Sequence, residues 1–372
     1  MRRAPLTLVL ALLAASGGLL LVDGCTIVNG LVVPHDGGAA SITDARTDAP
    51  LAPDAGDGCN HALPPPRPAV TDTADDLTVI AVARQILLST PSGTAPVGYD
   101  LDDTCSVDKA TETCLGSKPH SDPAGSGGID NNAGDLFNLV NSRTDLEKRV
   151  NDGIVLGKNS LLVRLGGYNG KADDPRVTVS IYASPGLLDG SGQPQPPQFV
   201  DTEAWSLDDA QFNAITDLPT ATTDGYVANG TVVAFLDAKI QLSDSFSLTL
   251  DGAYFTAQLD LTGAKPAITS GIIAGRWPAT DILRVLARQR TSDAGTALCD
   301  DALSYGVAKG IICGDLDIRS DRASDGKGLA CDATSASLRF LGGRANLGPR
   351  KMGTPDDPCP TFPADSCTGD GG

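Results

Sequence analysis

Apolar residues recur with a period of two along much of this chain. Leu161, Val163 and Leu165 share one side of an extended segment, and Ser160 and Arg164 share the other. That period belongs to a β-strand with one buried and one exposed face, which is typical of antiparallel sheets. Alternating or β-branched apolar runs predict strands over residues 77–88, 160–165, 177–182, 232–236, 268–273 and 335–341.

A hairpin is predicted where two alternating runs flank an Asp-Gly pair. The first run spans 246–250 and the second spans 255–261, with Asp251-Gly252 between them. Asp-Gly suits a type I′ turn, in which both central residues have positive φ.

Three segments have helical rather than strand periodicity. Residues 135–150 repeat apolar positions at helical spacing, and Gly153 follows as a stop signal. Thr280 is predicted to cap a helix over 281–290, and a short helix is predicted over 298–307.

The composition agrees with a turn-rich β protein. The chain has 372 residues, with 28 Lys plus Arg against 46 Asp plus Glu, a net charge of −18. Only Glu112, Glu147 and Glu203 are glutamates, and Asp favours turns and caps over helix interiors. We therefore predict a mainly β fold, an antiparallel β-sandwich or jelly-roll-like domain with a few peripheral helices. Its negative charge disfavours binding to nucleic acid.

The first 24 residues have the pattern of an export signal. Arg2 and Arg3 precede an apolar run over 5–22, which ends in Leu21-Val22-Asp23-Gly24-Cys25. This ending resembles a bacterial lipobox, and the resemblance implies acylation of Cys25. An ordinary cleaved signal peptide is the alternative. The lipid anchor predicts a location on the outer membrane, with the membrane contacted only through the acyl chains.

The remaining chain divides by composition into three parts. Residues 25–57 carry the anchor and an Ala-, Asp-, Pro- and Gly-rich tether, which cannot bury enough apolar surface to fold. Some thirty such residues reach roughly 30 Å as a flexible coil. A single β-rich domain is predicted over 58–360, and a flexible tail over 361–372.

Eight cysteines remain once Cys25 is assigned to the lipid. An even number in an exported chain indicates disulfides, although the sequence leaves their pairing open. Local Cys105–Cys114 and Cys359–Cys367 bridges are one interpretation. A zinc site is disfavoured because no close CxxC pair is present. The disulfide candidates are Cys59, Cys105, Cys114, Cys299, Cys313, Cys331, Cys359 and Cys367.

Catalytic patterns are weak. Of the three histidines, His35 and His61 lie in or beside the tether, and only His120 lies within the domain. The segment around Ser126 lacks the first glycine of a GxSxG motif. Pairs of Asp are inevitable at this composition, so they do not indicate a glycosidase by themselves, and aromatic residues are only 4% of the chain.

Calcium is the candidate ligand that the sequence favours. Carboxylate and amide oxygens crowd two loops that contain no Lys or Arg beside them, and Ca²⁺ binds six to eight oxygens on irregular backbone. A second acidic stretch over 315–325 contains Arg319 and Arg322, which can neutralise it without metal. The candidate metal ligands are Asp100, Asp102, Asp103, Asp130 and Asn131.

Four short patterns resemble a group of uncharacterised exported lipoproteins of myxobacteria. They are Gly98-Tyr99-Asp100-Leu101-Asp102, Gly128-Ile129-Asp130-Asn131, Leu165-Gly166-Gly167-Tyr168-Asn169-Gly170 and Cys331-Asp332-Ala333. The similarity covers about residues 59–359. It implies an envelope location and transfers no activity or site.

The sequence thus favours a non-catalytic surface or binding protein of the cell envelope, stabilised by Ca²⁺, with a protein or glycan ligand. An Asp-dependent hydrolase of glycans or esters is one alternative. A structural partner in an envelope complex is the other.

Overall fold

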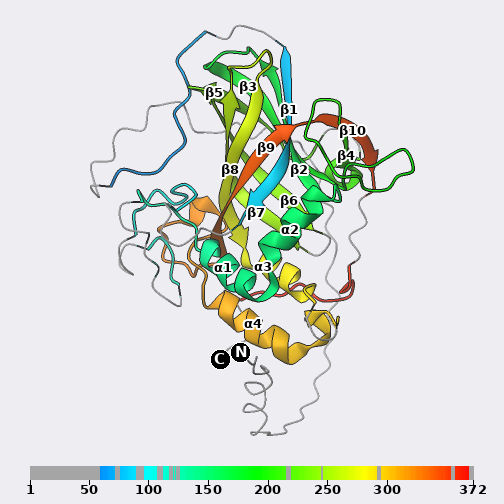
Figure 1. The fold of residues 1–372 in the computed structure, drawn as a ribbon. Coiled ribbons are helices and arrows are strands. Elements are labelled where there is room, and N and C mark those ends of the chain that lie inside the picture. Colours follow the sequence, from blue (N-terminus) through cyan, green and yellow to red (C-terminus); the bar gives the residue numbers. More distant parts are fainter. Residues whose placement is uncertain are drawn as a thin grey trace, which may run out of the picture. The chain divides into compact units, whose positions relative to one another are not determined.

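Eight antiparallel strands form one sheet that closes on itself in the computed structural model (Figure 1). The strands are β1 (Leu77–Leu87), β2 (Ser160–Tyr168), β3 (Asp174–Ser184), β5 (Thr222–Ala228), β6 (Thr231–Ser243), β7 (Phe246–Asp260), β8 (Ala267–Pro278) and β9 (Ala333–Arg344). Each strand pairs with the next one in this order, and β9 pairs with β1. The prediction of a mainly β, antiparallel, disulfide-linked fold is confirmed. The two packed faces expected of a sandwich are opposite walls of this closed barrel.

The structure describes most of the chain after residue 58. The described residues are 59–71, 76–88, 96–106, 112–116, 120, 122, 126–214, 219–243, 246–290, 295–352 and 357–367. The predicted export signal, Cys25 and the tether lie outside them. No helix among the described residues is both long and apolar enough to cross a membrane.

The barrel interior is filled by the side chains that the period of two places on one face. Leu161, Val163 and Leu165 of β2 are buried in one apolar cluster with Leu338 and Phe340 of β9. At about 25 cal/mol for each Å² of apolar surface removed from water, this cluster is the main source of stability.

The Asp251-Gly252 pair lies inside β7 and does not form the predicted hairpin turn. The pairing register shifts between Asp251 and Tyr254, and Gly252 has a φ of +54°. This is a β-bulge, which inserts one extra residue and changes which face the later side chains occupy. Leu250 before the bulge and Phe255 after it are therefore both buried although five positions separate them.

Four helices accompany the barrel, and each of them contributes at least one side chain to its core, Ile312 in the case of the last. They are α1 (Ala133–Thr144), α2 (Leu146–Val155), α3 (Ala279–Ala287) and α4 (Ala302–Cys313). Phe137, Ile154 and Leu283, from the first three, belong to the same buried cluster as the strands. Figure 1 shows α1, α3 and α4 gathered at one end of the barrel.

All three predicted helices have different boundaries in the structure. The one predicted over 298–307 is a short 3-10 turn over Leu298–Asp300 followed by α4, which ends only at Cys313. The helix predicted over 135–150 is interrupted at Asp145, whose φ of +50° is left-handed and ends one helix before the next begins. Thr280 is not a cap, because α3 begins one residue earlier, after Pro278.

A small parallel sheet outside the barrel was not predicted. Its strands are β4 (Ala204–Asp208) and β10 (Asn346–Lys351). Trp205 of β4 is fully buried against Val82 and Leu162, which point outward from the barrel. This layer removes apolar residues on the outer wall from water.

All eight cysteines predicted to form disulfides do so, but neither local bridge exists. The pairs are Cys59–Cys105, Cys114–Cys331, Cys299–Cys359 and Cys313–Cys367. Each cysteine pairs with one at least 46 positions away, because the packing of the strands and helices determines which loops meet. With these sulfurs in disulfides, none of the eight is a thiol for zinc binding or nucleophilic catalysis.

The end of the described chain is part of the domain. Asp365 accepts hydrogen bonds from the Tyr305 hydroxyl and Lys309 Nζ of α4, both at 2.8 Å. Cys367 is joined to Cys313 at the end of the same helix. Residues 361–367 therefore belong to the folded domain, whereas the sequence predicted a flexible tail from 361.

Candidate metal centre

Two loop segments, 98–106 and 126–132, lie on the outer wall formed by β7, β8 and β9. Tyr99 and Leu101 pack with Tyr254, Ala274 and Ile318 in an apolar cluster on this wall. The loops are fixed to β9 by polar contacts that strand alternation leaves available on its outer face.

Asn131 fixes the second loop to the barrel. Its Oδ1 accepts a hydrogen bond from the Ser337 amide at 3.0 Å, and its Nδ2 donates to the Val97 carbonyl at 2.9 Å. Next to it, the Asn132 amide donates to the Ser335 hydroxyl at 2.9 Å. Both polar ends of the Asn131 side chain are thus used in positioning Asp130.

Three of the five predicted metal ligands converge. Asp100, Asp102 and Asp130 each place a carboxylate oxygen within 4.8 Å of the others. Asp100 is fully buried and Asp130 is almost so. The Leu101 amide donates to Asp130 Oδ2 at 2.7 Å, so one loop's backbone is bound by the other loop's carboxylate.

Gly128 allows the two loops to approach this closely. Its φ is +73°, and a Cβ at this position would lie 2.7 Å from Asp100 Oδ2. A side chain there would be strained and would also push Asp100 out of the cluster.

Burial and mutual repulsion disfavour ionisation of these carboxyls. Burial, followed by the nearby charge of Asp100, raises the pKa of Asp102 to about 7, although the hydroxyl of Thr113 opposes the shift. Burial and the charge of Asp102 raise the pKa of Asp130 well above its usual value. Burial also raises the pKa of Asp100, against the opposing effect of His61, which contacts its Oδ2.

Two further acids surround the trio. Burial raises the pKa of Asp122 to about 6, and that of Asp317 is raised by the same cause. No ion pair formed by the described residues joins Asp102 or Asp130 to a lysine or arginine. Such a cluster must hold protons or a cation at neutral pH, because several adjacent buried carboxylates cannot all be ionised alone.

The other two predicted ligands are engaged elsewhere. Asp103, at a φ of +59°, forms an ion pair with Arg322, and Asn131 has the positioning role described above. The arginines of the second acidic stretch also act differently from the prediction. Arg322 pairs with Asp103 rather than with an acid of its own stretch, and Arg319 pairs with Asp332 at 3.0 Å.

Arg276 of β8 is the residue that sequence reasoning missed. It is 2% exposed, and its guanidinium binds both Asp325 oxygens, at 2.7 and 2.9 Å. It also donates to the carbonyls of Leu101 and Arg319, so it links both acidic segments to the barrel. No spacing signal could reveal it, because it sits in a strand far from either segment in sequence.

We expect the metal-free protein to lose stability as the pH rises from 5 to 8. The folded-state pKa of Asp102, about 7, lies above its unfolded value of 3.8. The stability that protonation contributes is therefore fully present below pH 3.8 and is lost as the pH rises through 7. At about 1.4 kcal/mol for each pKa unit, the loss should be about 2 to 4 kcal/mol. Denaturant unfolding in EGTA at pH 5, 6, 7 and 8 measures it.

The control for this pH series is Asp102→Asn, which should make the loss of stability between pH 5 and 8 smaller, while the raised pKa values of the neighbouring carboxyls keep the remainder. The carboxyls whose pKa is lowered, such as Asp189 and Asp301, gain their protons below the pH range used and do not interfere. A wild-type stability that is constant or rises from pH 5 to 8 would contradict the assignment.

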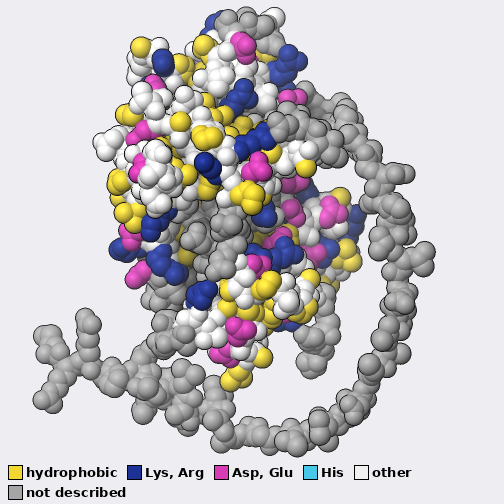
Figure 2. Space-filling model, turned by 90° about the vertical axis from the view of Figure 1, so that its right-hand side faces the viewer, with side chains coloured by type: hydrophobic (Ala, Val, Ile, Leu, Met, Phe, Trp, Pro, Cys, Tyr) yellow, Lys and Arg dark blue, Asp and Glu magenta, His cyan; other side chains and the backbone are white. Residues whose placement is uncertain are grey.

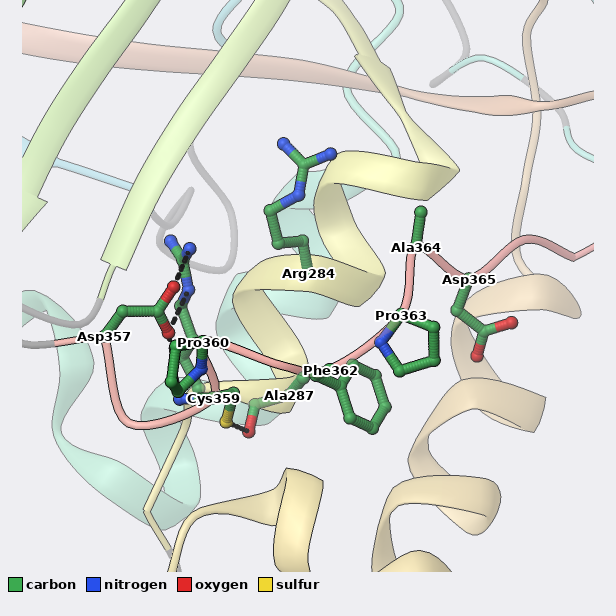
Figure 3. Close-up of a pocket in the computed structure, with 10 residues that line it drawn as sticks. Arg284, Ala287, Asp357, Cys359, Pro360, Phe362, Pro363, Ala364 and Asp365 are labelled. Atoms are coloured by element: carbon green, nitrogen blue, oxygen red, sulfur yellow. Dashed lines mark hydrogen bonds and ion pairs between the residues drawn. The ribbon is translucent and has the colours of Figure 1, made fainter. Parts of the chain in front are cut away.

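A separate cavity of about 300 Å³ lies between α3 and residues 357–365 (Figure 3). Arg288 on its wall binds Asp357 through Nε at 3.1 Å and Nη2 at 2.5 Å. Arg284 pairs with Asp281, and Asp365 with Lys309. The Arg288–Asp357 and Lys309–Asp365 pairs attach the C-terminal segment to the helices, and each of the four charged residues of the wall has an ion-pair partner.

The acidic cluster of Asp100, Asp102 and Asp130 is therefore the best candidate for a ligand site among the described residues, because its buried carboxylates require a compensating positive charge. Sequence and structure place it on a disulfide-linked loop layer outside a packed barrel. Comparison of the chain with family models, with curated proteins and with solved structures found no match, so its function is inferred from this geometry alone.

Proposed function

We propose that this protein is a non-catalytic binding protein of the cell envelope, held on the outer membrane by an acylated Cys25, in which Ca²⁺ organises the acidic loops. The observation that carries the proposal is the convergence of Asp100, Asp102 and Asp130. The lipobox-like sequence before Cys25 and the four disulfides support export and anchoring.

Three carboxylates suit Ca²⁺ in charge and in ligand type. They supply three to six of the six to eight oxygens that Ca²⁺ binds, and water supplies the rest. One divalent ion would compensate the repulsion that raises the pKa values of these groups. Binding would also tie segment 98–106 to segment 126–132 at the point where both meet the barrel, and so hold the loops in one conformation for a protein or glycan ligand.

We expect millimolar Ca²⁺ to raise the melting temperature of the oxidised domain relative to EGTA. A ligand at 100 times its Kd stabilises the folded state by about 2.7 kcal/mol. The effect should be larger at pH 8 than at pH 6, because Asp102, with a pKa of about 7, must release its proton to bind the ion. Differential scanning calorimetry at both pH values measures this.

The rise should be abolished in Asp102→Asn and in Asp130→Asn. Asp189→Asn is the matched control, because this exposed carboxylate caps only its own turn, through Ser191 and Gln193. The absence of a shift up to several millimolar Ca²⁺ would contradict the metal assignment.

Hydrolysis of a glycan or ester by the purified domain, lost in Asp102→Asn, would instead favour the Asp-dependent hydrolase. Co-purification with specific envelope proteins would favour a structural role in a complex.

A further inference from the structure

The outer face of α4 carries no polar side chain over its whole length. Its exposed positions are Ala302, Leu303, Gly306, Val307, Gly310 and Ile311. Leu303 is 78% exposed, Val307 60% and Ile311 47%. A Cβ at Gly306 or Gly310 would have no atom within 4 Å, so the face is open. We call these six residues the α4 face.

The α4 face stands out in an acidic chain. The net charge is −18, yet the charged residues of this region are turned away from the face or lie beyond its ends. Lys309 points inward to Asp365, and Asp301 binds the Ser304 amide at the start of the helix. Figure 1 places α4 at the helical end of the domain, and Figure 2 shows hydrophobic side chains gathered at that end.

The face is too small for a stable contact between two copies of the chain. A helix of 12 residues is about 18 Å long, whereas a standard protein interface buries about 800 Å² on each partner. Three large apolar side chains on one short helix supply only part of that area. A lipid leaflet makes no such demand, because each side chain inserts independently into the acyl boundary.

The position of the chain entry favours a leaflet as well. The folded domain begins at Cys59, which is bound to Cys105, and the Ala62 amide donates to the Gly127 carbonyl in the same loop layer. That layer also binds the chain just after α4, since Asn132 Nδ2 donates to the carbonyl of Asp315. The predicted tether of some thirty residues, with a reach of roughly 30 Å, thus joins the domain near the loops that hold the end of α4.

We propose that the α4 face inserts into the lipid leaflet to which Cys25 is anchored, so that the domain rests on the membrane through α4. This inference rests on the proposed lipid anchor. The acyl chains hold the domain at the leaflet, and the α4 face would add a second apolar contact that determines which side of the domain faces the lipid.

The test uses residues 55–372, which form one compact unit with all four disulfides and lack the acyl chain. We expect this domain to float with phosphatidylcholine vesicles. Leu303→Ser/Val307→Ser/Ile311→Ser should reduce the bound fraction at least tenfold without lowering the melting temperature, because all three side chains are exposed. Leu156→Ser/Leu329→Ser, at exposed apolar positions elsewhere, is the matched control and should float like the wild type.

A second readout uses Leu303→Trp. Both native tryptophans are buried, so the emission of the new residue should shift to shorter wavelength when vesicles are added. Absence of flotation at millimolar lipid would overturn the proposal. So would a concentration-dependent dimer, seen by sedimentation without lipid, that the triple serine variant abolishes. Mass spectrometry of Cys25 in the exported full chain tests the anchor separately, so failure of the anchor and failure of the α4 contact are distinguishable.

Discussion

Replacing Cys114 and Cys331 together by serine is expected to lower the free energy of unfolding by about 5 kcal/mol. This bridge spans 217 positions, the longest separation of the four disulfides. The chain entropy that a crosslink removes from the unfolded state grows with the logarithm of the loop it closes, which gives about 5 kcal/mol for this length. Denaturant unfolding of the oxidised wild type and of the double variant measures the difference.

The matched control is the double serine variant of Cys313 and Cys367, whose bridge spans 54 positions. The same relation gives about 4 kcal/mol for that loop, so the control should be the less destabilised of the two. Equal or reversed losses would show that strain or residual structure, rather than loop length, determines what each bridge contributes.

Arg276→Met is the second substitution with a large expected effect, a destabilisation of about 3 to 5 kcal/mol. Methionine keeps most of the length but removes the charge, which leaves Asp325 and the carbonyls of Leu101 and Arg319 without the guanidinium. Loss of one partner from a buried ion pair costs this much because the remaining charge stays desolvated. Thermal and denaturant unfolding measure the change.

Arg284→Met is the control for this substitution. Arg284 is also an arginine paired with an aspartate, Asp281, but its side chain is 56% exposed. Its replacement should cost less than about 1 kcal/mol. A loss at Arg276 as small as that at Arg284 would mean that the acidic loops keep their place on the barrel without the buried guanidinium.

The sequence predicts seven of the eight barrel strands at least in part, because one residue property, alternation, determines both the element and its buried face. It does not predict β5 (Thr222–Ala228). The inward residues of β2 and β9 are those that alternation selects. The prediction from sequence fails at Asp251-Gly252, because this dipeptide is compatible both with a hairpin turn and with a β-bulge. A two-residue turn would also place Leu250 and Phe255 on one face, because Phe255 would then lie opposite Leu248. The apolar pattern is therefore the same for a turn and for the bulge that shifts the register here, and only the pairing of β7 with β8 distinguishes them.

The candidate site is predicted only in part, for a reason of distance along the chain. Asp100 and Asp102 are neighbours in sequence, and Asp130 follows a glycine-rich loop, so their convergence could be expected. The roles of the other residues depend on partners that are distant in sequence. Arg322 pairs with Asp103, the Ser337 amide donates to Asn131, and Arg276 donates to the Leu101 carbonyl of the loop. Composition and spacing contain no information on which distant strand faces a loop.

The seam between β1 and β9 also determines when the barrel can close during synthesis. Leu87 pairs with Arg339, some 250 positions later, and a ribosome needs about 10 to 50 s to add that many residues. Until β9 is synthesised, the sheet has two unpaired edges. Cys114 also lacks its partner Cys331 during this time, whereas Cys105 is only nine residues away. In an oxidising compartment, any Cys105–Cys114 bridge that formed first would have to be undone by thiol–disulfide exchange before Cys114 could join Cys331.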